Sequence, residues 1–505
     1  MEPQTCILQS LAGGVAIALT YIILFHLKLS GSKFPYPSGP TGANMPIHDP
    51  WVQYQAWGEE YGKLVYIRES NTLIVNHLDV AYDLLEKRAR NYADRPVWRV
   101  GDRIGAGSIN FTFQRYSNKW RKSRRTFMQH FRQATIGQFH TAQYEEVHVF
   151  LQRLAKTPTD FLQHIQTFSQ GIIYSALYGF HVEQDDYVTR HSAPLIQELF
   201  NSVLAPFPLL EWFPWLERLP RWLPGCGYKQ AADQALKGFM ELKDVSFNRA
   251  MERFEHGSKN SLIAESAMKH AGSPEEVDGI KIMGVASSIA SFVTISSVVN
   301  SFMLAMVMHP YAQAKGQEEI DRVIGRDRLP IFEDRQLLPY VEAIYREVMR
   351  LNPPLPLCVA HVSIEDDVYR GYYIPKGCTV IPNIWAMNRD PSLYPDPDNF
   401  RPERFFEAPR PFTSINDIPA FGFGRRVCAG RYISDGTVWL TIACALASFK
   451  MGKGKDEEGN EIDVAGGYMS SPGLGFFRHP EPYKCSIVPR GPHVATETGE
   501  KDLIG

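Results

Sequence analysis

Apolar residues recur at every third or fourth position over much of the chain between about residues 115 and 350, the spacing of helices that bury one face. The clearest helical pattern ends before Pro353-Pro354, because proline interrupts a helix. Its apolar stripe consists of Leu338, Val341, Ile344, Val348 and Leu351. We therefore predict a helical body that contains a strongly amphipathic helix at this place.

Strand patterns are few and short. The runs 63–67 and 72–75 predict a small hairpin, and strand-like runs such as 379–381 alternate with prolines between residues 355 and 400. Strands and helices do not alternate in a recurring way, which argues against a parallel α/β sheet. The expected fold class is therefore mainly α with a small β component.

The first of two long uncharged runs lies near the N-terminus. Residues 6–27 carry no charge and are about long enough to cross a bilayer, and the lysines that follow place the rest of the chain on the cytoplasmic side. A cleaved signal peptide is the alternative, but no basic residues precede the run. We predict one transmembrane helix within a membrane anchor over 1–30, a Pro-rich hinge over 31–45, a main domain over 46–490 and a disordered tail over 491–505.

The second uncharged run, 282–308, also has the length of a membrane span. It contains eight Ser, Thr and Asn side chains, which is a heavy polar load for a segment in lipid. We therefore expect a long helix through the protein core. A net charge of −2 gives no broad basic field for nucleic acid, and seven scattered cysteines show neither zinc spacing nor a disulfide framework.

The stretch 421–430, FGFGRRVCAG, places Cys428 in a loop rich in glycine and arginine before a helix-like run. These residue types suit a thiolate that binds haem iron. Gly424 and Gly430 allow a close approach to a flat macrocycle, and the arginines and backbone N–H groups temper the charge on sulfur. Arg426 can pair with a haem propionate. The alternative is a buried structural cysteine in a turn.

The fixed spacing of Phe421, Gly424, Arg426, Cys428 and Gly430 resembles the haem-thiolate signature of the cytochrome P450 superfamily. The resemblance extends over nearly the whole chain. It implies the cytochrome P450 fold, heme b as cofactor and Cys428 as the axial ligand of the iron.

The same resemblance implies a monooxygenase that uses O2 and an apolar small-molecule substrate. Electrons are then expected from NADPH through NADPH–cytochrome P450 reductase. The main domain becomes a haem-thiolate catalytic domain in the cytosol, held by a single pass through the endoplasmic reticulum membrane and in contact with membrane lipid. No nucleic-acid partner is expected.

Three further residues are expected to hold the cofactor. Trp120 and Arg124 lie one turn apart, so an indole N–H and a guanidinium can both bond a haem propionate. By resemblance, His361 is expected to do likewise. The alternatives are an ordinary basic helix and a structural histidine.

Glu347 and Arg350 are also one turn apart, and an exposed pair of this kind contributes little to stability. The resemblance implies instead that both residues form a buried lock with Arg404. This lock would be structural, and would fix the loop that leads to the cysteine.

Residues 290–294 match the place where the family's long helix crosses the oxygen-binding face of the haem. Thr294 matches the usual alcohol and is the expected catalytic residue, whereas Val293 stands where an acid is usual. The alternative for Thr294 is a hydroxyl bonded to the carbonyl of its own helix, four residues back. The missing acid leaves open a haem-thiolate isomerase or dehydratase, and a non-catalytic haem protein.

Two surfaces are expected to contact partners. A basic patch would steer the acidic face of the reductase, with a solvated helix as the alternative. Its members are Arg121, Lys122, Arg124, Arg125, Arg425 and Arg431. An aromatic run, residues 212–223, is expected to face the membrane or to pack in the core. The segments 366–377 and 476–480 resemble fungal members that modify secondary metabolites, with terpenoid scaffolds expected first and aromatic or indole scaffolds second.

Overall fold

The computed structural model describes residues 33–42, 45–46, 48–204, 214–223, 226–258, 260–407, 418–464, 467–470 and 477–491. The predicted membrane anchor, and all but the first residue of the predicted tail, lie outside the described residues. The described part of the predicted hinge lies against the body, where the Tyr66 N–H donates to the Ser38 carbonyl at 3.0 Å and the Tyr373 N–H donates to the Pro35 carbonyl at 2.8 Å.

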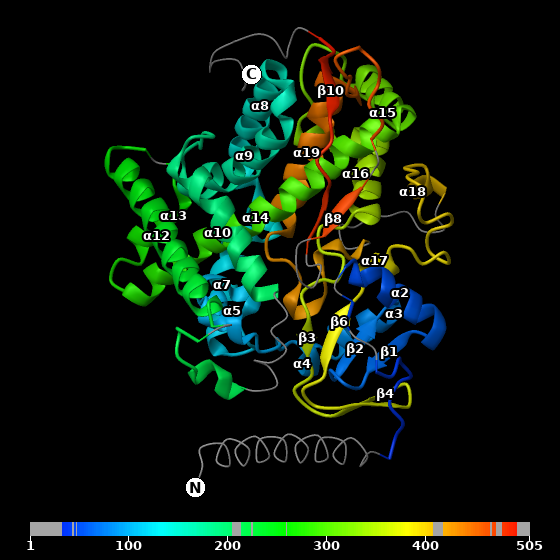
Figure 1. Cartoon of the computed structure of the whole chain (residues 1–505). Helices are drawn as coiled ribbons and strands as arrows, with labels where there is room; N and C mark the ends of the chain where they lie inside the picture. The colour runs from blue at the N-terminus through cyan, green and yellow to red at the C-terminus, as the bar shows by residue number, and fades with distance from the viewer. Residues whose placement is uncertain are drawn as a thin grey trace.

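Helices make up most of the molecule, which confirms the predicted class (Figure 1). The longer ones are α2 (Pro50–Tyr61), α7 (Asn118–Phe131), α8 (His140–Lys156), α9 (Phe161–Ile173), α10 (Tyr187–Leu204), α12 (Tyr228–Glu255), α13 (Leu262–Lys269), α14 (Pro274–Met308), α15 (Pro310–Val323), α16 (Pro339–Leu351) and α19 (Arg431–Ser448). Short helices include α3 (Leu78–Ala81), α4 (Ala89–Tyr92), α5 (Arg99–Arg103), α6 (Ala106–Ile109), α17 (Ile384–Met387) and α18 (Arg404–Glu407).

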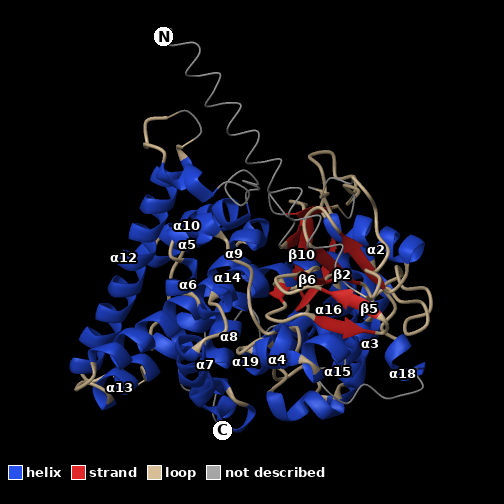
Figure 2. Ribbon diagram, turned by 90° about the horizontal axis from the view of Figure 1, so that it is seen from below, coloured by secondary structure: helices blue, strands red, loops and turns tan. Residues whose placement is uncertain are grey.

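The strands gather at one side of the body, away from α10, α12 and α13 (Figure 2). The largest sheet has the order β1-β2-β6-β3 and consists of β1 (Leu64–Ile67), β2 (Thr72–Val75), β6 (Thr379–Pro382) and β3 (His361–Val362). The remaining strands form three antiparallel pairs: β4 (Asp367–Tyr369) with β5 (Tyr372–Ile374), β7 (Phe449–Lys453) with β10 (Cys485–Pro489), and β8 (Tyr468–Ser470) with β9 (Arg478–Pro480).

The predicted hairpin is confirmed, because β1 and β2 pair antiparallel with Leu64 opposite Val75. One pairing differs from the expectation. β2 and β6 run parallel although about three hundred residues separate them, so a local strand–helix pattern could not reveal them. The fold therefore contains one parallel strand pair inside a mixed sheet.

The second uncharged run forms the central part of α14, a helix of 35 residues that packs against α9, α12 and α19. It is the one helix in the described part of the chain that is long and apolar enough to cross a membrane, and it is mostly buried. Two of its hydroxyls bond within the helix: Ser287 donates to the Met283 carbonyl at 2.8 Å and Ser288 to the Gly284 carbonyl at 3.1 Å. The prediction of a core helix is confirmed.

The predicted amphipathic helix is α16, and a carboxylate from α15 holds its first turn. Both oxygens of Glu319 accept from the backbone N–H of Tyr340, at 2.9 and 3.0 Å, and one also accepts from that of Val341 at 3.0 Å. An anion is favourable at this end of a helix because the first N–H groups have no partner within it. This anchor fixes the helix that carries Tyr345, Glu347 and Arg350.

Candidate active site

A cavity of about 240 Å³ lies inside the helical body. Cys428 borders it from the loop before α19, and Thr294 borders it from α14. Side chains of α7, α9 and α16 complete the wall, and most are apolar. The described residues that line it include no carboxylate. The loop predicted to carry the metal ligand and the helix predicted to carry the catalytic alcohol therefore meet at one cavity.

The loop around Cys428 is closed by its own backbone. The Cys428 N–H donates to the carbonyl of Phe421 at 2.8 Å, and both residues line the cavity. Burial raises the pKa of the Cys428 thiol, while the Gly430 N–H and the guanidinium groups of Arg124 and Arg431 act in the opposite direction. A bound metal cation reverses the effect of burial, because it stabilises the thiolate directly.

The two expected glycines have different roles. Gly430 lines the cavity, and a Cβ there would have its nearest neighbour 3.8 Å away, so the backbone leaves room for a flat group. Gly424 does not line the cavity, contrary to the expectation. Its φ is +54°, a Cβ would overlap the Leu85 carbonyl, and its N–H donates to Glu86 Oε1 at 2.6 Å. Gly424 is required by close packing beneath the loop.

A residue with a Cβ costs about 1–2 kcal/mol in a left-handed conformation. Gly424→Ala is expected to lower the free energy of unfolding by more than this, because the new Cβ also overlaps Leu85. Gly377→Ala is the matched control, since Gly377 has φ +80° and open space around it. Urea unfolding of the two variants separates overlap from backbone strain. Equal midpoints would contradict the packing role of Gly424.

Three guanidinium groups line the cavity, those of Arg95, Arg124 and Arg426. Arg426 donates from Nε to the Ala93 carbonyl at 2.7 Å and from Nη2 to the Gln114 carbonyl at 2.8 Å. Its buried Nη1 has no partner among the described residues. Burial and then the repulsion from Arg95 lower the pKa of Arg426 to about 8. Such a group calls for an anion that enters the cavity.

Trp120 contributes a second unpaired donor. Its buried Nε1–H meets no acceptor within the ranges that the structure describes, and the Arg426 guanidinium stacks 4.3 Å from the centre of its ring. Ser117 caps this turn of α7, since its hydroxyl accepts from the Trp120 N–H at 3.2 Å. The indole and the guanidinium are therefore held together as a pair of donors.

His361 is buried, and its Nε2 has no partner among the described residues. It does not border the cavity, and its Nδ1 lies 2.7 Å from the Tyr92 carbonyl, which can only accept, so Nδ1 carries a hydrogen. Burial, with Arg95 and Arg426 nearby, lowers the pKa of His361 well below 6.5. Nε2 of the neutral ring is then an acceptor. His361 can donate to a propionate only if its ring takes up a second proton, which the negative charge of the propionate would favour.

These donors fit haem. Haem is a flat apolar group with two carboxylates, and the cavity offers apolar walls, a thiol on one loop, and arginine and indole donors that lack an anion. Asp94, whose charge acts on Arg426, is occupied: it accepts from Arg115 at 2.6 and 3.0 Å and from the Tyr116 N–H at 2.7 Å.

Glu347, Arg350 and Arg404 form a buried ion network, and Glu347 and Arg350 are fully shielded from solvent. Both oxygens of Glu347 accept from Arg350 at 2.8 Å, and one also accepts from Arg404 at 3.0 Å. The remaining arginine donors bind backbone carbonyls between residues 388 and 399. This network ties α16 to the segment that precedes the cysteine loop, and it is not an exposed pair.

On α14, the Thr294 hydroxyl donates to the Ala290 carbonyl at 2.8 Å, which is the local bond considered as the alternative, and the residue also lines the cavity. Ser291 donates to the Ser169 carbonyl of α9 at 2.6 Å and so joins the two helices. Val293 is buried in the core and does not border the cavity. Hydroxyls are therefore the polar groups that α14 presents to this space.

The expected basic patch is smaller than the sequence suggested. Arg124 lines the cavity and so does not belong to the surface, and Lys122 pairs with Glu275 at 2.8 Å. Arg121 is exposed beside Tyr116, and Arg425 donates to the Tyr116 hydroxyl at 2.6 Å. In the aromatic run, Trp212 and Phe213 lie outside the described residues. Trp215 and Trp222 are 58% and 79% exposed, so they do not pack in the core.

Arg95 is a cavity residue that was missed at the level of sequence. Arg95 donates to the carbonyls of Val359 and Ala360 at 2.6 and 2.7 Å, contacts that bury it only in the folded chain. Cys358 places a second thiol at the cavity in a left-handed backbone with φ +54°. A lone arginine before proline gives no pattern that would have identified Arg95.

The cytochrome P450 family model matches residues 43–484. The cytochrome P450 monooxygenase COX1 of Coprinopsis cinerea is 33% identical over 98% of this chain and 99% of its own length. The cytochrome P450 monooxygenase claR of Ampulloclitocybe clavipes is 33% identical over 94% of this chain and 90% of its own. Tryptamine 4-monooxygenase of Psilocybe cyanescens is 32% identical over 90% of this chain and 93% of its own.

Proposed function

Because this chain belongs to the cytochrome P450 family and is a monooxygenase, we propose that it inserts one oxygen atom of O2 into a hydrophobic small molecule, by hydroxylation or epoxidation. One observation carries this proposal: Cys428 and the hydroxyl-bearing face of α14 border the same largely apolar cavity. The relatives named above are all described as monooxygenases, which argues against the isomerase, dehydratase and non-catalytic alternatives.

Heme b is the cofactor that these residues would hold, and the Cys428 thiolate would bind its iron. Arg426, Arg124 and Trp120 would bind the propionates, and Arg95 would add positive charge beside them. Haem supplies the oxygen-activating redox chemistry when it is bound. The protein orients the substrate, excludes water and keeps the thiolate in place.

Thr294 and Ser287 offer hydroxyl oxygens at the cavity wall. Each donates its own hydrogen to a helix carbonyl, so its lone pairs are left to accept from water or substrate. Since Val293 cannot carry a proton, protons would reach the cavity through such hydroxyls and ordered water. The apolar remainder of the wall suits a substrate with few polar groups.

NADPH–cytochrome P450 reductase is the proposed electron donor. Arg425 belongs to the loop that leads to Cys428. The side chains of Arg425 and Arg121 both lie beside the ring of Tyr116. A positive surface here would attract the acidic face of a flavoprotein and make the encounter depend on salt. We place the enzyme at the endoplasmic reticulum membrane, with residues 1–30 as a single-pass anchor and the catalytic domain in the cytosol.

Secondary metabolism of the fungal type is the proposed setting. Terpenoid scaffolds are the first candidate, because the cavity wall is mainly apolar. Indole scaffolds are the second, because the Psilocybe relative is a tryptamine 4-monooxygenase and tryptamine is an indole. To test both candidates, terpenoids and indoles are supplied to membranes that contain this chain and a reductase, and the products are profiled. Turnover without NADPH would contradict monooxygenation.

Trp215 and Trp222 are proposed to contact lipid. A quencher restricted to the bilayer is expected to reduce tryptophan fluorescence of the full chain in liposomes, and less so in the double variant Trp215→Phe/Trp222→Phe. Trp439→Phe is the control, because Trp439 is fully buried. Equal quenching of the wild type and the double variant would place these indoles in water.

A further inference from the structure

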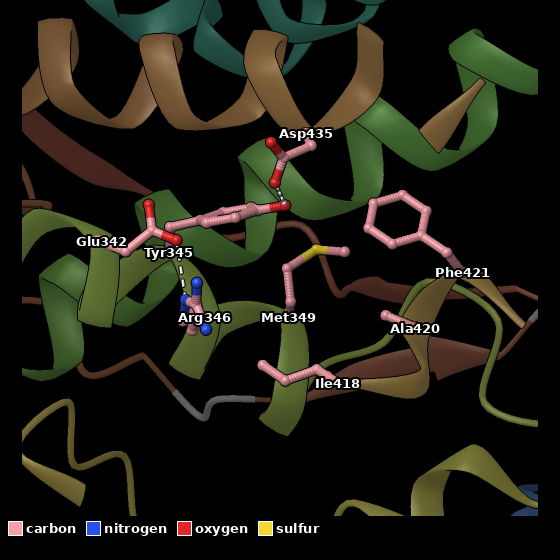
Figure 3. A pocket seen from close by; sticks show the side chains of 8 residues that line it. All are labelled: Glu342, Tyr345, Arg346, Met349, Ile418, Ala420, Phe421 and Asp435. Carbon is pink, nitrogen blue, oxygen red and sulfur yellow. Dashed lines mark hydrogen bonds and ion pairs between the residues drawn. The ribbon is translucent and has the colours of Figure 1, made fainter. Parts of the chain in front are cut away.

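A small chamber lies between α16, α19 and the segment that leads to Cys428 (Figure 3). Its roughly 20 Å³ of space for water centres is enough for one water molecule. Tyr345, Met349, Ala420 and Phe421 line this chamber and also the larger cavity. A single layer of side chains therefore separates the chamber from the proposed haem site.

A charged network forms the other side of the chamber. Asp435, in the second turn of α19, accepts from Arg335 at 2.5 and 3.1 Å. Arg335 also donates to both oxygens of Glu342, at 2.9 and 3.2 Å, and Arg346 donates to Glu342 at 2.8 Å. Two carboxylates balance two guanidinium groups, and all four side chains are largely shielded from water. The network joins α16 to the helix that follows the cysteine.

Tyr345 connects this network to the cavity wall. Its ring is buried and borders both spaces, and its hydroxyl donates to Asp435 Oδ1 at 2.9 Å (Figure 3). Burial and the Asp435 carboxylate raise the pKa of Tyr345 well above 10, so the phenol remains a donor at every working pH. The Tyr345 hydroxyl thus links the wall of the larger cavity to the start of α19.

We propose that Tyr345 is a positioning residue for the thiolate ligand. Its hydroxyl holds α19 through Asp435, and its ring lines the same two spaces as Phe421, whose carbonyl accepts from the Cys428 N–H at 2.8 Å. Tyr345 thereby ties the start of α19, directly after the Cys428 loop, to the cavity wall. This inference rests on the proposed haem-thiolate function. Without the hydroxyl, α19 and the loop shift more easily, and the iron–sulfur bond is lost in a larger fraction of molecules.

The chain offers a matched pair of variants. Tyr345→Phe and Tyr340→Phe each remove one phenol–carboxylate hydrogen bond from α16, since Tyr340 donates to Glu403 Oε1 at 2.8 Å. Tyr340 does not border the cavity. In the haem-loaded full chain, Tyr345→Phe is expected to raise the ratio of thiolate-free to thiolate-ligated ferrous carbon monoxide complex about fivefold, the factor given by one ordinary hydrogen bond.

Tyr345→Phe is also expected to shift the midpoint potential of the iron, whereas Tyr340→Phe leaves both the ratio and the potential at their wild-type values. Equal values in the two variants would overturn the inference, because the effect would then be general to α16. A Tyr345→Phe protein indistinguishable from wild type would overturn it as well.

Asp435 provides a second test. Asp435→Ala removes the acceptor of Tyr345 and also the ion pair with Arg335. If the phenol acts through Asp435, Tyr345→Phe should change the ratio in the wild-type background and leave it nearly unchanged in the Asp435→Ala background. An equal change in both backgrounds would refute the role of the phenol. A wild type without thiolate ligation would refute the proposed function itself, which is a separate outcome.

Discussion

Cys428→Ala is expected to abolish NADPH-dependent oxidation of whichever apolar substrate the wild type converts. The loop presents this thiol to the cavity, and the spacing around it resembles the family's haem-thiolate signature. The electron-rich thiolate tunes the iron for oxygen chemistry, and alanine offers neither a ligand nor a charge. Product formation in membranes that contain reductase measures the loss.

Cys358→Ala is the control with the closest match, because Cys358 is a second thiol on the same cavity. Burial raises the pKa of both thiols, so neither is a free thiolate without a metal. Cys358 lies in a left-handed turn outside the signature loop, and we expect its alanine variant to keep NADPH-dependent turnover. Loss of turnover in Cys358→Ala with retention in Cys428→Ala would reverse the assignment of the ligand.

Glu347→Gln is expected to cost about 3–5 kcal/mol of stability, because it leaves two buried guanidinium groups without their carboxylate. That is a large part of the roughly 5–15 kcal/mol that keeps a domain folded. The yield of haem-loaded chain should fall sharply, and the urea midpoint of the remaining protein should drop.

Asp463→Asn gives the comparison at the surface. Asp463 and Lys453 lie 2.6 Å apart, but the carboxylate is 92% exposed, so the pair contributes little to stability. Urea unfolding of both variants separates a buried lock from an ordinary surface pair. A Glu347→Gln chain as stable as Asp463→Asn would show that the Glu347 network does not hold the cysteine loop.

The parts of the site that sequence could predict are those coded by short spacing. The signature loop occupies ten consecutive residues, and Glu347 and Arg350 stand one turn apart on a clear amphipathic helix. Even there, spacing alone could not tell an exposed pair from a buried one. Burial of Glu347 depends on Arg404 and on carbonyls between residues 388 and 399, which only the folded chain brings together.

The parts that sequence could not predict depend on contacts over long distances. Arg95 becomes a cavity residue because the carbonyls of Val359 and Ala360 hold it. The parallel pairing of β2 with β6 also joins segments far apart in the chain, where local periodicity carries no information.

Sulfur ligation of the haem iron by Cys428 is the central claim, and one spectrum tests it most directly. Purified full chain loaded with haem is reduced and treated with carbon monoxide, and its difference spectrum is recorded beside that of Cys428→Ala. The wild type should show the strongly red-shifted band of a thiolate-ligated complex, and the variant should lack it. A folded, haem-loaded wild type without that band, or a Cys428→Ala variant that retains it, would contradict the account.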